Sequence, residues 1–534
     1  MPDRIPVQDA SITLKFGGGL ATRAPEDEIT DREAADGRNF VLDILNAEFI
    51  NRKPFDFVAQ AANYGSINGG GNVIKSDGSI GMFIQAGNTV YEYDGSTFLS
   101  ATLDTVNANA KLRGHWRTQN SQLDNKVIIT DLALLEVVKE WDGTTWADVT
   151  FTDQSGSGFG TFYAKYCTVL DERAIFAHVK DASSTLPHMV VASDRSDYTV
   201  ITNTLRAGAV SAADAFFLLS PDLKPINGLL DAFGSLLIST DKGRLFDLTG
   251  SDASDFAFNE FYGGSSAVGD EALTYVGNDI FYGRAGRIES LKDTDRFGDA
   301  EANDLTIQIA DRIEGYGQWT IVYNSRLDRV YAFPDSVSEC WYLNKAVRDA
   351  GELSPWVRWT TSHSMAFQPT FVQAMLDPAD GLEYVFMGDS GGNLYRLEGT
   401  GTAGDGGSAD IRVESLSKLF VMPEDAKAFD IDGYLKYRRG DLADISLTLE
   451  TQGEEIESNE LVVTLPNASG GPYYNNSSYY NNGEYYGTSG IGKLERVHFT
   501  FPGGSNEFQI RVRYDGTKDI EINEIGLRFK ASGD

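Results

Sequence analysis

The sequence predicts an all-β protein, with a β-propeller of six or seven blades followed by a C-terminal β-sandwich that serves as a platform-type domain. Short runs of alternating apolar and polar residues are bounded by Gly, Asp and Asn, as in 81–95, 125–143 and 234–250. Each run has the length of a β-hairpin. The hairpins recur at intervals of about 40–57 residues, which is the period of a four-stranded propeller blade. Beyond residue 400, alternating strands continue without this period, as in a sandwich.

The repeat is anchored on one strand of each hairpin. Turn dipeptides follow several of these strands, for example Asp94-Gly95, Asp142-Gly143 and Glu398-Gly399. Such turns suit the tight antiparallel meander of a blade. The seven anchors are Tyr91, Val138, Met189, Phe246, Ile288, Tyr342 and Tyr395.

The chain divides into four segments on this pattern. Residues 1–60 are expected to contribute to the platform or to closure of the propeller, and 61–400 to form the propeller. A Gly-rich linker spans 401–410, and 411–534 form the β-sandwich. Helical periodicity is rare: 303–314 is the clearest candidate, and 31–46 is a second one that Gly37 weakens.

Composition excludes several classes of partner. The 534 residues carry 45 Lys and Arg against 78 Asp and Glu, a net charge of −33. A chain this acidic is not expected to bind nucleic acid by counterion release or to bind an anionic membrane surface. No apolar run approaches the length of a membrane span, and the opening residues lack a secretory signal, so no membrane anchor is expected. Cys167 and Cys340 are expected to be buried free thiols.

No catalytic constellation emerges, so we expect neither an enzyme nor a bound cofactor. The sequence contains five histidines, and no two of them have the spacing of a metal-binding motif: His115, His178, His188, His363 and His498. The triplets Gly17–Gly19 and Gly69–Gly71 are interpreted as flexible turns, because no helix or Lys follows them. The segment 239–246 resembles the Asp-box of sialidase-like propellers, a turn on the blade rim without a catalytic role. The acidic group Asp293, Asp295, Asp299 and Glu301 fits either a calcium loop or a solvated loop.

Two segments of the last domain stand out. The first is an acidic run without Lys or Arg, interpreted as a solvated hairpin tip and as a candidate channel or tip loop: Asp441, Asp444, Glu450, Glu454, Glu455, Glu457 and Glu460. The second is rich in Tyr and Asn, and suits either packing on a neighbouring subunit or sugar binding: Tyr473, Tyr474, Tyr479, Tyr480, Tyr485 and Tyr486.

The tryptophans cluster in two places. Trp141 and Trp146 flank a blade turn, and Trp341, Trp356 and Trp359 lie within about twenty residues of one another. At strand spacing they are expected to form the core between blades. The absence of positive charge around them argues against a base-stacking role.

In order along nearly the whole chain, the sequence resembles the tail nozzle family of short-tailed bacteriophages, also described as tail accessory or packaged-DNA stabilisation proteins. The likeness begins with the N-terminal glycines, Asn39-Phe40 and the Arg52-Lys53-Pro54 turn. It continues through 90–98, 162–179, 191–199, 226–250 and 276–291, and ends in the closing strands of 520–534. The Tyr/Asn segment departs from the family.

This resemblance implies a virion structural protein, made in the cytoplasm of a bacterial host. Such proteins form a homohexameric ring below the portal and a tail adaptor ring, in some cases next to fibres or spikes. The ring retains the packaged genome and provides the channel through which double-stranded DNA leaves without specific binding. A negative lumen would let the duplex slide. The alternative interpretation is a host-glycan-binding or carbohydrate-active propeller.

Overall fold

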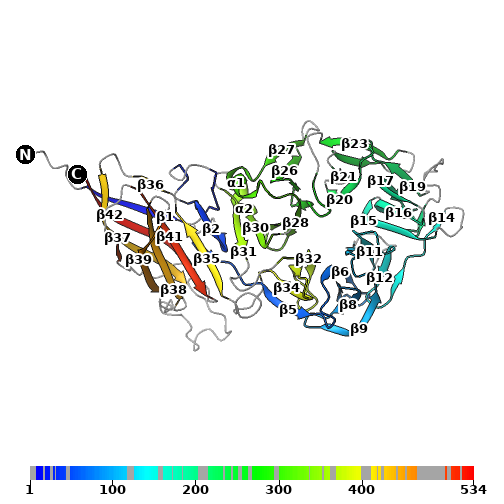
Figure 1. Ribbon diagram of the computed structural model, residues 1–534. Coiled ribbons are helices and arrows are strands. Elements are labelled where there is room, and N and C mark those ends of the chain that lie inside the picture. The colour runs from blue at the N-terminus through cyan, green and yellow to red at the C-terminus, as the bar shows by residue number, and fades with distance from the viewer. Residues whose placement is uncertain are drawn as a thin grey trace, which may run out of the picture.

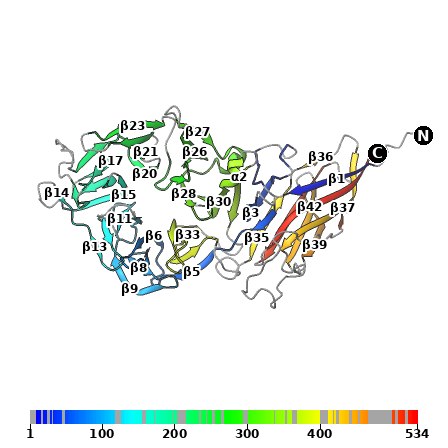
Figure 2. The same cartoon turned by 180° about the vertical axis from the view of Figure 1, so that it is seen from behind.

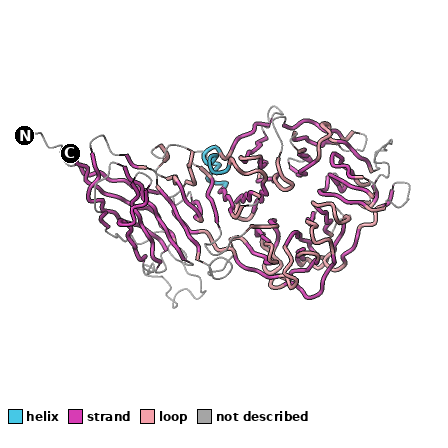
Figure 3. Tube along the Cα trace, viewed as in Figure 1, coloured by secondary structure: helices cyan, strands magenta, loops and turns pink. Residues whose placement is uncertain are grey.

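The computed structural model shows two bodies lying side by side, a ring of β-blades and a smaller two-sheet unit (Figure 1). The same arrangement is seen from behind in Figure 2. Strands account for most of the chain, and the helices lie near the point where the bodies meet (Figure 3). The structure describes residues 8–15, 18–23, 28–30, 32–43, 48–116, 126–153, 160–170, 172–182, 184–195, 197–201, 215–232, 235–241, 244–250, 255–262, 267–293, 300–335, 337–350, 354–360, 368–398, 410–417, 419–421, 426–439, 443–451, 454–465, 499–501, 507–516 and 520–533.

The ring is a β-propeller, which confirms the predicted fold class. Five four-stranded sheets and one eight-stranded sheet that contains two meanders make seven blades within the described residues. The strands of blades 1 to 3 are β6 (Ile67–Ile74), β7 (Ile80–Ala86), β8 (Thr89–Tyr93), β9 (Phe98–Thr105); β10 (Leu112–Trp116), β11 (Val127–Asp131), β12 (Lys139–Trp141), β13 (Trp146–Asp148); and β15 (Phe162–Leu170), β16 (Arg173–Asp181), β17 (Thr185–Ala192), β19 (Phe216–Leu219).

The other four blades follow the same up-and-down order. Their strands are β20 (Ile226–Ala232), β21 (Ser235–Thr240), β22 (Leu245–Thr249), β23 (Ala257–Tyr262); β24 (Leu273–Val276), β25 (Asp279–Arg284), β26 (Arg287–Asp293), β27 (Ala300–Asp304); β28 (Trp319–Asn324), β29 (Arg329–Pro334), β30 (Glu339–Asn344), β31 (Trp356–Thr360); and β32 (Phe371–Leu376), β33 (Glu383–Gly388), β34 (Asn393–Arg396), β5 (Asp56–Gln60). A separate short parallel pair is formed by β14 (Thr152–Asp153) and β18 (Val200–Ile201).

The ring closes through its innermost strands and through the N-terminal part of the chain. The strands β6, β10, β15, β20, β24, β28 and β32 contact one another in this order, and β32 contacts β6 again. Blade 7 takes its outer strand, β5, from before blade 1, because β5 pairs antiparallel with β34. Residues from opposite ends of the propeller segment thus share one sheet.

The predicted repeat marks the third strand of every blade. Tyr91, Met189, Phe246, Ile288, Tyr342 and Tyr395 lie in β8, β17, β22, β26, β30 and β34, and Val138 directly precedes β12. The first three strands of each blade form a meander and are consecutive in the sequence, so each blade contributes one anchor. The seven anchors therefore match the seven blades. The turns Asp94-Gly95 and Asp142-Gly143 are alike. Each Asp Oδ1 accepts hydrogen bonds from the backbone N–H groups of the second and third residues after it, and each Gly has a positive φ.

The smaller body is a sandwich of two six-stranded sheets. It is built from both ends of the chain. One sheet joins β1 (Gln8–Lys15), β3 (Phe40–Asp43), β4 (Glu48–Asn51), β37 (Ala426–Arg439), β40 (Phe499–Phe501) and β42 (Glu521–Gly533). The other joins β2 (Asp36–Arg38), β35 (Ile411–Leu416), β36 (Phe420–Val421), β38 (Ala443–Thr451), β39 (Glu454–Leu465) and β41 (Glu507–Gly516).

The propeller is therefore inserted between the N-terminal strands and the remaining strands of the sandwich. Residues 401–409 of the predicted linker lie outside the described residues.

Both predicted helices need correction. Residues 31–46 form no helix where described, because β2 and β3 occupy this segment and pair with β35 and β4. Only η1 (Ile307–Ile309) and the single turn α1 (Ala310–Ile313) occur within 303–314, after β27. The other helix in the described residues is α2 (Lys345–Ala350). Pairing of the sheets overrides local helical periodicity here.

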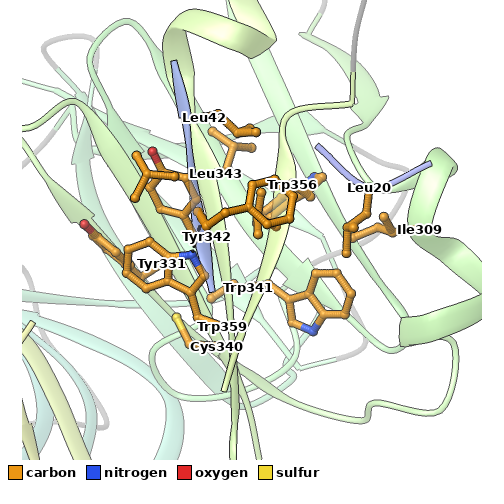
Figure 4. Packing of buried hydrophobic residues seen from close by; sticks show 14 of the residues in the cluster. Leu20, Leu42, Ile309, Tyr331, Cys340, Trp341, Tyr342, Leu343, Trp356 and Trp359 are labelled. Atoms are coloured by element: carbon orange, nitrogen blue, oxygen red, sulfur yellow. Dashed lines mark hydrogen bonds between the residues drawn. The ribbon is translucent and has the colours of Figure 1, made fainter. Parts of the chain in front are cut away.

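The tryptophans correct another expectation. Trp141 does pack between blades 1 and 2, against Phe83. Trp356 and Trp359, however, lie on β31 of blade 6, where the outer strand of the blade meets the N-terminal strands of the sandwich. Figure 4 shows Leu20 and Leu42 packed with the aromatic residues of blade 6. One hydrophobic core continues from the propeller into the sandwich.

A polar junction borders this core. Asn39 is fully buried with φ 62, in the left-handed region that Asn tolerates. Its Nδ2 donates to Arg412 O (2.7 Å), and its Oδ1 accepts from Thr360 N (2.8 Å) and Arg52 Nε (3.0 Å). Arg52 Nη2 donates to Thr360 O (2.9 Å), and its guanidinium lies 4.0 Å from the ring centre of Phe55. Asn39 and Arg52 thus bind the N-terminal segment, blade 6 and the sandwich together.

The glycine triplets are not flexible turns in the described residues. Gly69–Gly71 lie in the interior of β6, and a Cβ on Gly71 would come within 2.7 Å of Gly114 Cα on β10. This close approach fuses blades 1 and 2 into one sheet, with Arg113 paired to Gly70. A Cβ on Gly19 would lie 2.1 Å from Trp356 O, at the junction with blade 6.

Candidate functional site

Two adjoining cavities occupy the axis of the propeller. The inner cavity, of about 290 Å³, is walled by residues of β10, β15, β20, β24, β28 and β32. The outer cavity, of about 350 Å³, opens at one mouth of the ring and is lined by Asn68, Lys111, Asp335 and Thr370 among others. Arg113, Glu271, Thr320 and Val372 line both cavities. Concave space where several elements converge is the usual place for a ligand site.

An ion pair separates the two cavities. Arg113 on β10 donates to both carboxylate oxygens of Glu271, from Nε (2.5 Å) and from Nη2 (2.8 Å). Its Nη1 donates to Asn68 O (2.8 Å) and Leu112 O (3.0 Å), and the guanidinium lies 5.0 Å from the ring centre of Phe371. A bidentate pair with this many bonds holds a fixed geometry. It links blade 2 to the segment that enters blade 5, and so ties opposite sides of the ring.

The mouth of the outer cavity presents two opposite charges. Lys111 and Asp335 both line it and are exposed, and the Lys111 charge acts on the Asp335 carboxyl. Burial raises the pKa of Asp335, and the negative charges of Glu271 and Asp270 raise it further, whereas Lys111 lowers it. Within the described part of the chain, neither side-chain terminus has a hydrogen bond or an ion pair.

The wall of the inner cavity carries a hydrogen-bonded chain between blades 2, 3 and 5. Thr130 Oγ1 donates to Lys165 O (2.8 Å), so its contact with His115 Nε2 (2.8 Å) requires the imidazole to donate. Burial, and then the Arg113 charge, lower the pKa of His115 to about 4. Tyr166 Oη donates to Asp270 Oδ1 (2.8 Å), which Lys165 also contacts at 3.2 Å. The neutral imidazole here supports the wall.

The acidic run of the sandwich is only partly the solvated tip that the sequence predicted. It forms the hairpin β38–β39, and Asp444 and Glu460 are exposed on it. Glu450, by contrast, is buried and accepts a hydrogen bond from Arg511 of the neighbouring β41. Asp441 lies outside the described residues, and the structure describes Glu454, Glu455 and Glu457 only as strand backbone of β39.

This hairpin carries a concentrated part of the negative charge of the C-terminal segment. Residues 411–534 contain 13 Lys and Arg and 20 Asp and Glu, a net charge of −7. Seven of these 20 carboxylates lie in the run 441–460, which contains no Lys or Arg.

For the other predicted sites, the structure describes few of the residues. The Tyr/Asn segment with its six tyrosines lies outside the described residues, as do Asp295 and Asp299. Among the described residues, no cluster of His, Cys, Asp or Glu could hold a metal ion, and no helix is long and apolar enough to span a bilayer. Cys167 and Cys340 are buried free thiols, as predicted.

The Asp-box-like segment and Glu398 both lie next to blade strands. The Asp-box-like segment lies between β21 and β22, as a blade turn should. Glu398 lies in the turn after β34, as predicted, with φ 51, but its surroundings differ from those of the exposed Asp94. It is buried, and it accepts hydrogen bonds from Arg329 and Tyr331 of blade 6.

Sequence reasoning missed the residues of the axial cavities. Lys111, Arg113, Glu271 and Asp335 lie on or beside strands of three different blades and share no spacing. Arg113 gives the one local signal of this site, because it is a charged residue within a short strand that otherwise carries apolar or aromatic residues and Gly.

Comparisons with known proteins complete the description. No protein-family model and no curated protein matches the chain. Similar solved structures include YCF48 bound to D1 peptide (11% identity, TM-score 0.40, covering 66% of this chain and 94% of that one) and the β-propeller domain of Cps50 (Swd1) from Myceliophteria thermophila (12%, 0.39, 63% and 98%). A third is the extracellular domain of a putative hybrid two-component system from B. thetaiotaomicron (8%, 0.43, 79% and 58%).

Proposed function

We propose that this protein is a structural component of a short-tailed bacteriophage tail, a nozzle subunit that assembles as a homohexameric ring below the portal and adaptor. The ring retains the packaged genome and forms the channel through which DNA leaves. The protein is then a virion protein without an enzymatic role, and its partners are further copies of itself, the adaptor ring and tail fibres or spikes.

The observation that carries this proposal is the position of the residues that begin the resemblance. Asn39-Phe40 and Arg52-Lys53-Pro54 lie where the N-terminal segment packs on blade 6, before it leaves the sandwich for β5 of blade 7. Asn39 and Arg52 make the buried hydrogen bonds of that junction. A load-carrying ring subunit needs its two bodies to be held in one fixed orientation, and a continuous core with a bonded junction meets that need.

The charge distribution supports the same proposal. A lumen that carries DNA without binding it must offer the phosphates little positive charge. In the C-terminal segment, seven carboxylates fall in the run 441–460, which has no Lys or Arg and covers most of the β38–β39 hairpin. Asp444 and Glu460 of this run are exposed. We place this hairpin toward the channel or its tip.

No specific observation favours the glycan-binding alternative. The segment that suggested it lies outside the described residues, and Phe371 at the axial cavity is buried under the Arg113 guanidinium rather than open to a sugar face.

Native mass measurement with negative-stain imaging of the purified full chain tests the assembly. The proposal expects an annulus of six copies, about 350 kDa from six chains of 58.4 kDa, either alone or when the adaptor ring is added. A species that stays monomeric with the adaptor and binds host glycans contradicts the proposal.

A further inference from the structure

We propose that the outer axial cavity of the propeller binds a small zwitterion, a molecule that carries one carboxylate and one ammonium group, as free amino acids and ω-amino acids do. The site is independent of the ring assembly proposed above. Its residues come from blades 1, 2, 6 and 7 and from the segment that enters blade 5.

The charged side chains of the outer cavity are only partly paired with one another. The cavity is lined by two cationic side chains, Lys111 and Arg113, and by two carboxylates, Glu271 and Asp335. Arg113 and Glu271 neutralise each other through two hydrogen bonds. Lys111 and Asp335 remain, and in the described part of the chain neither side-chain terminus has a hydrogen bond or an ion pair. A ligand that satisfies both must therefore carry both signs of charge.

The Asp335 carboxylate is incompletely hydrated although the residue is exposed. The cavity walls around it raise its pKa by burial even though Lys111 opposes that rise, and no counter-ion is in contact with it in the described part of the chain. An ammonium group placed against Asp335 recovers the lost solvation, and the matching carboxylate does the same for Lys111. Charge-assisted hydrogen bonds of this type are the stronger ones in proteins.

The size and walls of the outer cavity suit a small aliphatic ligand. The volume of about 350 Å³ lies at the lower end of the range of small-molecule pockets, enough for an amino acid or a dipeptide. Apolar wall atoms come from Phe333, Pro334 and Pro369, and Phe371 is covered by the Arg113 guanidinium. The aliphatic chain of a zwitterion fits between such walls, whereas no aromatic face is free to stack on a sugar ring.

The fixed Arg113–Glu271 pair forms the floor of this site. Because Arg113 also donates to two backbone carbonyls, the pair does not open to accept a ligand without losing buried bonds. Selectivity then rests on the separation of Lys111 and Asp335.

The test is calorimetric titration of the full chain with ω-amino acids of increasing length, from glycine to 6-aminohexanoate. Acetate and ethylammonium serve as single-charge probes. We expect one length to bind best, with a dissociation constant of about 1 mM or tighter, and both single-charge probes to bind at least about tenfold more weakly. Equal binding of all lengths, equal binding of acetate, or binding of none overturns the proposal.

Three variants complete the test. Lys111→Met and Asp335→Asn each remove one charge from an exposed side chain, and each should weaken the best ligand about tenfold or more. Glu314→Gln is the matched control, because Glu314 is exposed and lies outside both cavities; it should bind as the unaltered chain does. Undiminished binding in Lys111→Met or in Asp335→Asn contradicts the assigned site.

Discussion

Arg52 Nε donates a 3.0 Å hydrogen bond to Oδ1 of Asn39, and both side chains are fully buried at the junction of the propeller and the sandwich. The two residues lie on either side of the β3–β4 hairpin. Through this bond and the contacts to Thr360 and Arg412, one amide and one guanidinium connect three segments that are far apart in the sequence. The junction is thus specified by side chains and by apolar contact together.

Removing the guanidinium should weaken this junction. In Arg52→Met, the bonds to Asn39 Oδ1, Thr360 O and Lys53 O are lost while much of the side-chain volume stays. We expect the free energy of unfolding to fall by about 3 kcal/mol, because acceptors are left buried without a donor. Urea unfolding followed by tryptophan fluorescence measures it, since Trp356 and Trp359 lie at the junction.

Arg326→Met is the matched control for that variant. Arg326 is exposed, donates to Glu383 O and lies over the ring of Tyr384. Its loss should cost less than about 1 kcal/mol. Equal losses in the two variants would show that Arg52 has no special part in the junction.

The fused blades make a second prediction. Gly71→Ala places a Cβ 2.7 Å from Gly114 Cα and 2.7 Å from Phe83 Cε1, so β6 and β10 must move apart. We expect a loss of about 3 kcal/mol in the free energy of unfolding, in the upper range for overpacking. Gly315→Ala, where the new Cβ meets no atom within 4 Å, should stay within about 0.5 kcal/mol of the unaltered chain. A tolerated Gly71→Ala contradicts the close-packing role.

The third prediction concerns pH. His115 has a folded-state pKa of about 4, below its ordinary value of 6.5, so the unfolded chain binds the proton more readily than the folded one. The contribution of this group is present in full above pH 6.5 and is lost as pH falls from 6.5 toward 4, by about 3 kcal/mol over the window.

The variant His115→Gln isolates this effect from the many carboxylates. The stability advantage of the unaltered chain over His115→Gln, measured by urea unfolding, should shrink by about 3 kcal/mol between pH 7 and pH 4. A constant advantage across that range would mean that His115 titrates normally in the folded protein.

The acidic hairpin makes a fourth prediction, for phage particles. Reversal of Glu454, Glu455 and Glu457 to Lys should slow genome ejection, because positive charge in the lumen would hold the phosphates. Glu450→Gln is the comparison. Glu450 is buried against Arg511, so this change should lower stability and leave the ejection rate unchanged. Ejection kinetics that stay the same in the triple variant count against a channel-facing hairpin.

Local pairing explains what the sequence could predict. The anchors of the repeat marked the third strand of each blade because consecutive strands of a meander pair through short turns. The period therefore survives in the sequence. For closure of the ring, the sequence predicted only that residues 1–60 contribute to the platform or to closure. The closing strand itself could not be identified, because β5 pairs with β34 from the other end of the propeller segment.

Long-range contacts also explain the errors. Gly69–Gly71 resembled a turn because the strand that requires small residues there, β10, lies about 40 residues later. Glu450 resembled a solvated acid because its partner Arg511 follows 61 residues later. The axial residues carry no signal for the same reason, since the ring brings Lys111 and Asp335 together from different blades.

Imaging of intact virions that contain this chain would show whether it forms the proposed nozzle. We predict six copies in a ring at the tail, below the portal and adaptor, with the β38–β39 hairpins directed to the DNA channel or its tip. Particles that lack the chain, or that carry it as separate copies away from the channel, would contradict the proposed function.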